Sequence, residues 1–468
     1  MEPPPPAARA DTGRRRASGR VWVLAGLALL VLIALGVAIA LLTGGQKESQ
    51  VANVATPTAQ TYPTQPPPPP PTVGPAPARP FECMDRIGCV DVGPGLPIRI
   101  GYLLATAGEN APLGIDSRRG VDLAIADRRE VRGHPLELIG MDTRCGADSG
   151  VAAAKELSGD RQLVAIVGPS CSNEARVAIP ILCRAGISLV SPSSTAPDLT
   201  AEDRPADSWC FLRTAHNDLV QGVAAARFVR EALKLERAAT IHDGSLYADR
   251  LQQIFAEEFR KLGGTITAQE GVDPQGVDAK PVLARIADTK PQILYYPMFF
   301  GAGVPITRQA REVPGLENVK RMASDGIFFP DFLKAVDDAA VGFFWSSPDL
   351  TAMGPGYGDF VKKYRDRYGE APISAFHAHA YDATMMILSA IERVAVQDAD
   401  GTLHIPRAAL NEALHATQGF PGLTGALSCN QHGDCADPKI AVYECVNPDP
   451  ASWNPGPGPD NNPRKIWP

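Results

Sequence analysis

The sequence predicts an α/β protein of two doubly wound lobes that follow an N-terminal transmembrane helix. Three observations support this prediction. Residues 21–42 form a run of 22 residues without a charge. From residue 97 onwards, apolar strand patterns alternate with helical patterns, as they do in parallel sheets covered by helices on both faces. The alternation comes in two successive sets, which fit two sheets better than one very wide sheet.

Residues 21–42 have the length of a membrane-spanning helix. An α-helix of this length would measure roughly 33 Å, which is enough to cross the hydrocarbon core of a bilayer. Residues 1–20 carry clustered arginines, and the flank after the run is nearly neutral. The positive-inside rule therefore places 1–20 in the cytoplasm and the globular part on the extracytoplasmic side of the cell membrane, as a single-pass protein. A cleaved signal peptide is the alternative, although its apolar region is usually shorter, about 7–15 residues.

Residues 43–80 are expected to form a disordered, Pro-rich linker. Its stretch "PTQPPPPPPTVGPAPARP" contains too much proline for a folded core, and it favours an extended polyproline II spacer. A ligand for an SH3-type domain is the alternative, but an extracytoplasmic location favours the spacer. At the other end of the chain, residues 448–468 are expected to be a Pro- and Gly-rich tail.

In the first α/β set, each strand pattern is followed by a helical pattern. The strands are expected at 98–105, 135–143, 163–169 and 187–194, and the helices at 117–131, 149–160 and 173–186. In the second set, helices are expected at 220–235, 247–264, 277–291 and 301–313, and strands at 237–244, 265–272, 292–299 and 320–326. A long helix at 374–396 and a hairpin within 419–446 complete the pattern.

All nine cysteines follow the apolar run, where disulfides can form. Two pairs bracket short loops, and each is expected to form a disulfide: Cys83–Cys89 and Cys429–Cys435. Zinc is a weaker alternative because the chain has no Cys-x-x-Cys pair. We also expect a Cys183–Cys210 disulfide and a free thiol at Cys445, although the pairing of these three cysteines stays open.

Several classes of function are disfavoured. Beyond residue 50 the chain holds 39 basic and 49 acidic residues, a net charge of −10, which argues against nucleic acid as a partner. No dinucleotide, phosphate-loop or nucleophile-elbow motif is present. Ser172 has no local base and acid to make it a nucleophile, and His377 and His379 lie on different faces of a predicted helix. We therefore expect no catalytic residue, no metal site and no cofactor.

The stretch 165–175, "AIVGPSCSNEA", ends a buried strand in small hydroxyl residues at the start of a predicted helix. The first N–H groups of a helix lack intrahelical partners and lie at the positive end of its dipole. Ser172 and its neighbours could therefore cap the helix or bind a carboxylate. Taken alone, this stretch favours the cap.

A second strand, in "SLVSPSSTAPDLT", also ends in hydroxyl residues, which include Ser193, Ser194 and Thr195. Neighbouring parallel strands end at the same edge of a sheet, and ligands bind at that edge in open α/β folds. Two hydroxyl clusters at one edge suit a carboxylate better than two coincidental caps.

Several stretches together resemble the branched-chain (Leu/Ile/Val-type) amino-acid periplasmic binding proteins, which are type I solute-binding proteins of ABC importers. They are residues 165–200, "FLRTAHND", "IHDGSLYADRLQQIF" and "ILYYPMFFGAGVPITRQAR". The likeness runs from about residue 97 to 446. It implies a domain at 81–447 with two lobes joined by several crossovers: lobe 1 at about 97–215 and 346–415, and lobe 2 at about 216–345 and 416–447.

The resemblance also implies roles for single residues. The carboxylate-binding serine of the family falls on Ser172, and the loop that contacts the carboxylate and ammonium of the ligand falls on Ser193, Ser194 and Thr195. An aromatic residue from lobe 2 falls on Tyr247. Side-chain pocket positions fall on Leu113 and Phe376, and a disulfide of lobe 1 falls on Cys145 and Cys171.

The chain departs from the family pattern in two places. Phe299 and Phe300 stand where the family has a tyrosine, and Asp325 stands where its acidic partner of the ammonium is commonly Glu. These changes leave open an amino acid of different size or an amide-type ligand. The leading hypothesis is a membrane-anchored receptor that delivers an amino acid to ABC permease subunits. The alternative is an amino-acid- or amide-sensing ectodomain with a separate signalling partner, because one fold serves several roles.

Overall fold

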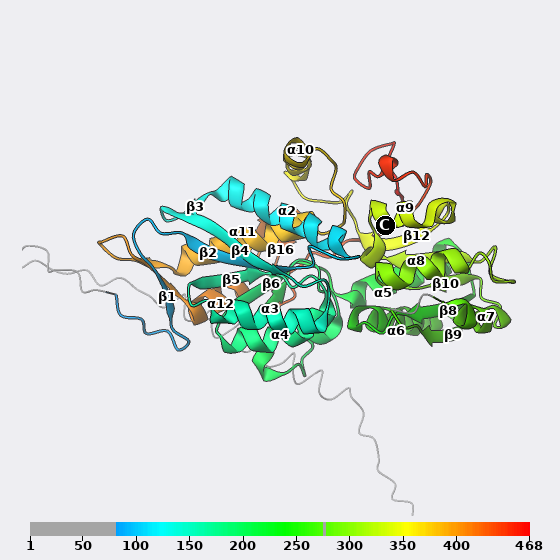
Figure 1. Ribbon diagram of the computed structural model, residues 1–468, viewed down its shortest axis with the longest axis horizontal. Coiled ribbons are helices and arrows are strands. Elements are labelled where there is room, and N and C mark those ends of the chain that lie inside the picture. The colour runs from blue at the N-terminus through cyan, green and yellow to red at the C-terminus, as the bar shows by residue number, and fades with distance from the viewer. Residues whose placement is uncertain (1–80, 275–277) are drawn as a thin grey trace, which may run out of the picture. The chain divides into compact units, whose positions relative to one another are not determined.

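The computed structural model describes residues 81–274 and 278–468. They contain two large sheets with helices on both faces (Figure 1), which confirms the expected two-lobe α/β class. The expected cytoplasmic tail, transmembrane helix and linker, residues 1–80, lie outside the described residues. Within the described ranges, no helix combines the length and the apolar character needed to cross a membrane.

The sheet of lobe 1 has six strands in the order β3-β4-β2-β5-β6-β7, and only β3 runs antiparallel to its neighbour. Its strands are β2 (Ile98–Leu104), β3 (Glu130–Val131), β4 (His134–Asp142), β5 (Leu163–Val167), β6 (Ser188–Ser191) and β7 (Phe211–Arg213). Every residue of β5, LVAIV, is buried. A continuous apolar run of this kind is typical of a strand covered on both faces.

Helices cover both faces of the lobe 1 sheet, as Figure 1 shows. Helices α2 (Ala111–Arg128) and α11 (His377–Val394) pack together on one face, and α3 (Ala147–Gly159) and α4 (Ser172–Arg184) pack together on the other. Lobe 1 therefore receives its last large helix, α11, from a part of the chain that follows the parallel strands of lobe 2.

The sheet of lobe 2 has seven strands in the order β18-β17-β12-β11-β10-β8-β9. Its parallel strands are β8 (Arg237–His242), β9 (Thr265–Gly271), β10 (Ile293–Tyr295), β11 (Lys320–Ser324) and β12 (Phe344–Pro348). Strands β17 (Ile440–Glu444) and β18 (Arg464–Trp467) are added antiparallel at one edge. The helices are α5 (Asp218–Arg227), α6 (Leu246–Lys261), α7 (Lys280–Asp288), α8 (Phe300–Gln309) and α9 (Pro330–Val336).

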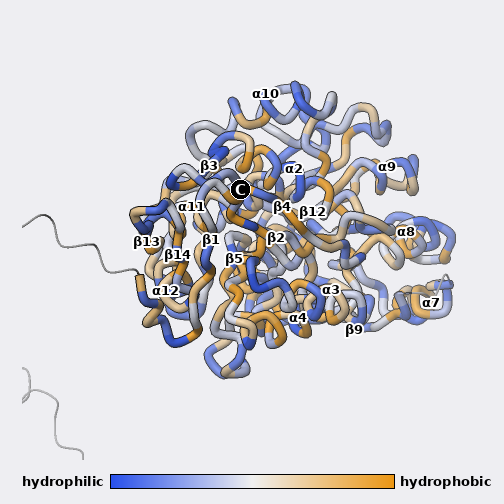
Figure 2. Tube along the Cα trace, turned by 60° about the vertical axis from the view of Figure 1, so that its left-hand side comes forward, coloured by the Kyte–Doolittle hydropathy of each residue, from blue (hydrophilic) through white to orange (hydrophobic). Residues whose placement is uncertain are grey.

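Buried apolar side chains hold each lobe together. Coloured by hydropathy, the chain shows recurring orange stretches along the strands, with blue in many outer turns (Figure 2). In lobe 2, Trp345 is fully buried and meets Phe328 and Phe332 edge-on, with ring centroids 5.9 and 5.7 Å apart. Aromatic pairs in this arrangement add to the stabilisation that comes from burial alone. Phe328 lies three residues after Asp325, so this aromatic cluster anchors the segment that carries Asp325, a candidate site residue.

All four expected disulfides are present: Cys83–Cys89, Cys145–Cys171, Cys183–Cys210 and Cys429–Cys435. Cys445 is the free cysteine among the described residues and is buried. The structure thus resolves the pairing that the sequence left open.

Two segments differ from the expected boundaries. Leu427, Cys429 and Cys435 pack in the core of lobe 1, so residues 416–435 extend lobe 1 and the chain enters lobe 2 only at β17. The C-terminal segment is more than a tail, because β18 pairs with β17 and aligns Lys465 with Tyr443. Strand β17 offers an unpaired edge, and β18 covers it.

Other elements have no counterpart in the sequence prediction. They include β3, β7, β12 and α9, and also β1 (Cys89–Val92), β13 (Val396–Gln397) and β14 (Leu403–Pro406), which form a small sheet, α10 (Tyr357–Tyr368) and α12 (Arg407–His415). The expected hairpin is the pair β15 (Phe420–Gly422) and β16 (Gly425–Leu427).

Candidate ligand-binding site

The carboxyl ends of the parallel strands of both lobes supply one cavity of about 10 Å³. Its lining residues from lobe 1 are Leu113, Ser170, Cys171, Ser172, Ser193 and Phe376, and those from lobe 2 are Tyr247, Phe299, Asp325 and Gly326. Seven of the ten expected ligand-binding residues are therefore brought together. A pocket of this size holds about one water molecule, so the lobes must separate before a larger ligand can enter.

The chain makes a sharp turn at the end of β5. Gly168 has a φ of +130°, and a Cβ there would lie 2.3 Å from the Leu103 carbonyl oxygen, so only glycine fits. The turn leads directly into α4, whose N-cap is Cys171. Because β5 pairs with β6 in parallel, the turn lies next to the loop that follows Ser191.

Ser172 does not cap α4. The capping group is the Glu174 carboxylate, whose Oε1 accepts hydrogen bonds from the backbone N–H groups of Ser170 at 2.6 Å and Cys171 at 3.0 Å. Ser172 Oγ instead accepts the Ala196 N–H at 3.1 Å. With that acceptor role filled, the Ser172 hydroxyl can donate its own hydrogen into the cavity.

The second hydroxyl loop is tied to the first by its own side chains. Ser193 Oγ donates to the Ser170 carbonyl at 2.9 Å, and Ser194 Oγ donates to the Pro169 carbonyl at 2.9 Å. Ser194 does not line the cavity, so its role in this structure is to support the loop. Thr195 is also outside the lining, but its Oγ1 is buried and has no hydrogen-bond partner among the described residues.

Asp325, directly after β11, is the acidic group of the cavity. Its Oδ1 accepts hydrogen bonds from Tyr247 Oη at 3.2 Å and from the Gln221 amide. Burial raises the pKa of Asp325 above its usual range, while His216, Gln221 and Tyr247 act in the opposite direction. The Gln221 amide oxygen accepts from His216 Nε2 at 2.6 Å, so a chain of hydrogen bonds leads from Asp325 to His216.

Asp218 is a second acidic group that the sequence did not single out. It begins α5, is fully buried, and neither of its carboxylate oxygens has a hydrogen-bond partner in the described part of the chain. Burial raises the pKa of Asp218 well above its ordinary value and the nearby charge of Asp325 raises it further, while the neighbouring Thr195 hydroxyl and the charge of Arg213 act in the opposite direction. Its backbone N–H donates to the Thr195 carbonyl at 3.1 Å, so the acid lies beside the hydroxyl loop. The sequence signal was weak because acids are common in the first turn of any helix.

Apolar side chains form the rest of the cavity wall. Leu113 and Phe376 come from lobe 1, and Phe299 comes from lobe 2, where its ring centroid lies 5.3 Å from that of Tyr247. Phe300 was expected to belong to this group, but it points elsewhere. It begins α8 and stacks on Phe329 with centroids 5.8 Å apart, because successive side chains at a helix start face different directions.

A larger cavity of about 530 Å³ adjoins this one and shares Phe299 with it. Its walls come from both lobes and include Glu109, Arg144, Asn173 and Asp243. The Cys145–Cys171 disulfide contributes one cysteine to each cavity. We therefore take the larger cavity as the mouth of the cleft.

Both lobes also touch each other outside the cavity. The Arg250 guanidinium on α6 forms a two-pronged ion pair with Asp198 of lobe 1, with Nε–Oδ1 and Nη2–Oδ2 distances of 2.9 Å. The Leu246 N–H donates to Asn173 Oδ1 at 2.6 Å. These contacts describe a closed arrangement of the cleft.

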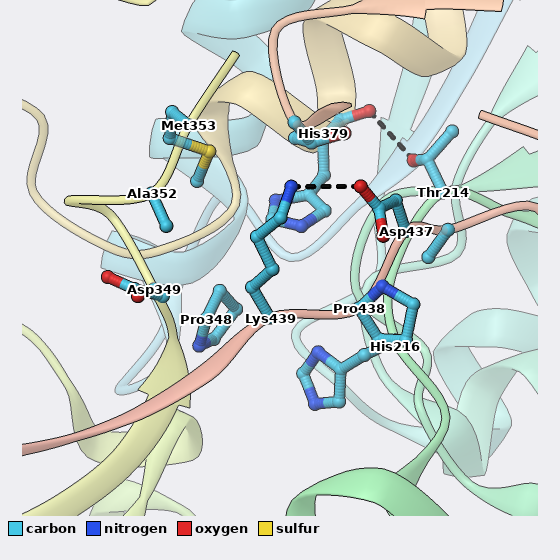
Figure 3. A pocket seen from close by; sticks show the side chains of 12 residues that line it. Thr214, His216, Pro348, Asp349, Ala352, Met353, His379, Asp437, Pro438 and Lys439 are labelled. Carbon is cyan, nitrogen blue, oxygen red and sulfur yellow. Dashed lines mark hydrogen bonds and ion pairs between the residues drawn. The ribbon is translucent and has the colours of Figure 1, made fainter. Parts of the chain in front are cut away.

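Three crossover segments connect the lobes and surround a small cavity of about 20 Å³ (Figure 3). The segments are 214–217, 348–353 and 436–439. The Thr214 hydroxyl donates to the His379 carbonyl at 2.8 Å, and Lys439 pairs with Asp437 at 2.9 Å. Burial lowers the pKa of His379 to about 3, so this histidine is neutral at physiological pH.

The chemistry of the site is that of binding. Lobe 1 lines the cavity with serine hydroxyls, lobe 2 lines it with the Asp325 carboxyl, and aromatic and aliphatic side chains from both lobes complete the wall. Among the described residues, no group of three or more potential ligands is arranged to hold a metal ion.

A family model described as periplasmic binding protein matches residues 97–447. The chain belongs to the periplasmic binding protein family. The resemblance inferred from the hydroxyl loops and the strands of lobe 2 is thereby confirmed, and the family acts by binding solutes rather than by catalysis.

Individual relatives are distant but consistent with one another. A Leu/Ile/Val-binding protein of Rhizobium johnstonii is 25% identical over 282 residues, which cover 60% of this chain and 72% of that protein. A leucine-binding protein of Thermotoga maritima superposes with a TM-score of 0.67 at 26% identity, covering 75% of this chain and 96% of that one. A branched-chain amino-acid binding protein of Streptococcus pneumoniae, solved with isoleucine, gives a TM-score of 0.67 at 21% identity over 80% of this chain and all of that one. At that identity, the last likeness concerns the fold.

Proposed function

We propose that this protein captures an amino acid of branched-chain or similar apolar type outside the cytoplasm and delivers it to an ABC permease. The observation that supports it most is the division of the cavity. The Ser172 hydroxyl lines the cavity from lobe 1 and Asp325 lines it from lobe 2, while the buried Thr195 and Asp218, which are neighbours, lie outside the lining. A zwitterion needs both kinds of partner, because burying either charge unpaired is costly.

The two ends of the ligand have separate partners in this proposal. The carboxylate accepts hydrogen bonds from Ser172 and Thr195, which have donor capacity left after their contacts within the protein. The ammonium pairs with Asp325 and Asp218, which are both buried, and burial raises the pKa of each above its usual value. Charged hydrogen bonds of this kind are stronger than neutral ones.

The side chain of the ligand meets Leu113, Phe299 and Phe376, which favours an apolar group. Because Asp325 is one methylene shorter than Glu, the ammonium lies nearer to lobe 2 or contacts the acid through a water molecule. Binding holds the lobes closed because the ligand contacts both of them, so that closure and capture are one event.

For the N-terminal segments we propose a tethering role. Residues 21–42 anchor the protein in the cell membrane, and residues 43–80 hold the two lobes away from it. A closed, loaded protein would then present both lobes to the permease while staying attached to the same membrane.

A thermal-shift panel of amino acids on residues 81–468 tests the proposed function. We expect stabilisation by apolar amino acids, about 2.7 kcal/mol at a ligand concentration one hundred times the dissociation constant. The proposed function would be contradicted if carboxylates that lack an ammonium group stabilise the protein and no amino acid does.

A further inference from the structure

The sequence motif "CNQHGDC", residues 429–435, takes no part in the proposed contacts with the ligand. It lies far from the hydroxyl loops in sequence but beside them in the structure. Its disulfide closes a loop that runs next to β7, where the Arg213 N–H donates to the Gly433 carbonyl at 2.9 Å and the Cys435 N–H donates to the Arg213 carbonyl at 3.0 Å. Gly433 has a φ of +94°, and a Cβ there would lie 2.5 Å from the Phe211 carbonyl oxygen, so the close approach requires glycine.

Arg213 is a fully buried guanidinium at the end of β7. Its Nη1 donates to two carbonyl oxygens of the second hydroxyl loop, that of Ser194 at 3.1 Å and that of Ala196 at 2.9 Å. Its Nη2 donates to Thr200 Oγ1 at 2.6 Å. These two carbonyls flank Thr195, whose own carbonyl accepts the Asp218 N–H. Three successive carbonyls of the loop are therefore held, and the Thr195 hydroxyl between them has no hydrogen-bond partner within residues 81–274 and 278–468.

Asp434 supplies the charge that a buried guanidinium requires. Its Oδ1 accepts from Arg213 Nε at 2.5 Å, and its Oδ2 accepts from Asn217 Nδ2 at 3.3 Å. Burial acts to raise the pKa of Asp434, but the charge of Arg213 together with hydrogen bonds from Arg213, Asn217 and Thr200 holds it below its usual range. Removing one partner of a buried pair is much more harmful than removing an exposed one, because the remaining charge loses its compensation.

We propose that Arg213 and Asp434 are positioning residues that fix the Thr195 hydroxyl toward the carboxylate end of the ligand. The Cys429–Cys435 loop then serves as an outer support of the binding site. Neither side chain lines the cavity, so the pair acts through the backbone of residues 194–196. This inference rests on the proposed function for the identity of the ligand, but the ordering of the loop can be measured without a ligand.

The test compares Asp434→Asn and Arg213→Lys with a matched control. Asp434→Asn keeps the shape and removes the charge, while Arg213→Lys keeps the charge and removes the planar fork. The control is Asp207→Asn, which breaks a surface pair with Arg184 at 2.6 Å on the same lobe. Exposed pairs of this type contribute little.

Two readouts are measured on the full chain. Hydrogen exchange of the peptide that covers residues 192–199 reports the loop directly. Calorimetry with L-leucine and with L-leucinamide reports the carboxylate side, and we expect leucine affinity to fall about tenfold or more, the scale of one charged hydrogen bond. Leucinamide affinity should change much less. A purely structural weakening would lower both affinities by the same factor.

We expect faster exchange of this peptide and the leucine-specific loss in both variants, and neither in Asp207→Asn. Unchanged exchange, or equal losses for the two ligands, in a folded variant would overturn the inference. If one variant fails to fold, the other decides. If the wild type binds no amino acid, the proposed function is wrong. The hydrogen-exchange measurement still tests the positioning role, because it needs no ligand: faster exchange in the variants supports that role, and unchanged exchange contradicts it.

Discussion

Tyr247 donates a hydrogen bond to Asp325 Oδ1 at 3.2 Å, and both side chains face the same cavity from lobe 2. The Tyr247 oxygen also lies 2.6 Å from Ser324 Oγ and accepts the Gly326 N–H at 3.3 Å. The carboxyl is therefore held in a fixed direction before any ligand arrives. Preorganisation of this kind reduces the entropic cost of binding.

Replacing Asp325 by Asn should weaken amino-acid binding by about 2–4 kcal/mol, because it removes one partner of a buried charged pair. The variant keeps the size of the side chain, and circular dichroism checks its folding. Asp288→Asn, at an exposed position at the end of α7, is the control and should bind like the wild type. Calorimetry measures both. A folded Asp325→Asn protein within twofold of the wild type would show that the ammonium is held elsewhere.

Binding should release protons and strengthen as the pH rises. The pKa values of Asp325 and Asp218 are raised in the free protein, so at low pH these carboxyls are protonated, and a bound ammonium favours their ionised form. The same shifts make the free fold less stable as the pH rises from the ordinary carboxyl pKa through the raised values. Calorimetry at one pH in two buffers of different ionisation enthalpy counts the protons. If ligand binding releases no protons in the wild type and none in Asp218→Asn, this account is contradicted.

Phe299→Ala should reduce affinity for leucine more than for alanine, because the longer side chain loses its contact with the ring. The expected difference is about 1–3 kcal/mol, the scale of a change in a hydrophobic pocket. The neighbouring Phe300→Ala is a matched control, since Phe300 is also half-buried but stacks on Phe329 outside the cavity. Equal effects of the two variants on leucine binding would place Phe299 outside the site.

Asp198→Asn should lower affinity by at most about fivefold and only at low salt, because the ion pair with Arg250 across the cleft is exposed to solvent. The side chains of Arg250 and Asp198 are 40% and 41% exposed. Titrations at low and high ionic strength measure the effect, with Asp366→Asn, which pairs with Lys362 within α10, as the control. A large loss that persists at high salt would mean that this pair is a main determinant of closure.

The sequence predicted the parts of the fold that depend on local pattern. The strand endings after Val167 and Ser191 were visible because buried runs stop at small polar residues, and their adjacency follows from parallel pairing. The sequence alone could not show that Glu174 rather than a serine caps α4. An acid in the first turn of a helix also interacts favourably with the helix dipole without capping it.

Long-range pairings were outside the reach of the sequence. Cys89 pairs with Pro406 in the small sheet, and Lys465 pairs with Tyr443 at the edge of lobe 2. Short strands of this kind owe their conformation to a distant partner rather than to their own residues. The same holds for Asp434, whose contact with Arg213 spans 221 positions.

The central claim is that the cavity recognises both charges of an amino acid. A calorimetric comparison of three ligands tests it most directly. Calorimetry compares L-leucine with 4-methylpentanoate, which lacks the ammonium, and with 3-methylbutylamine, which lacks the carboxylate. We expect leucine to bind and each truncated compound to lose about 2–4 kcal/mol, since either loss leaves buried polar groups unpaired. Binding of 4-methylpentanoate as tight as that of leucine would contradict the account, because the two buried carboxyls would then have no part in recognition.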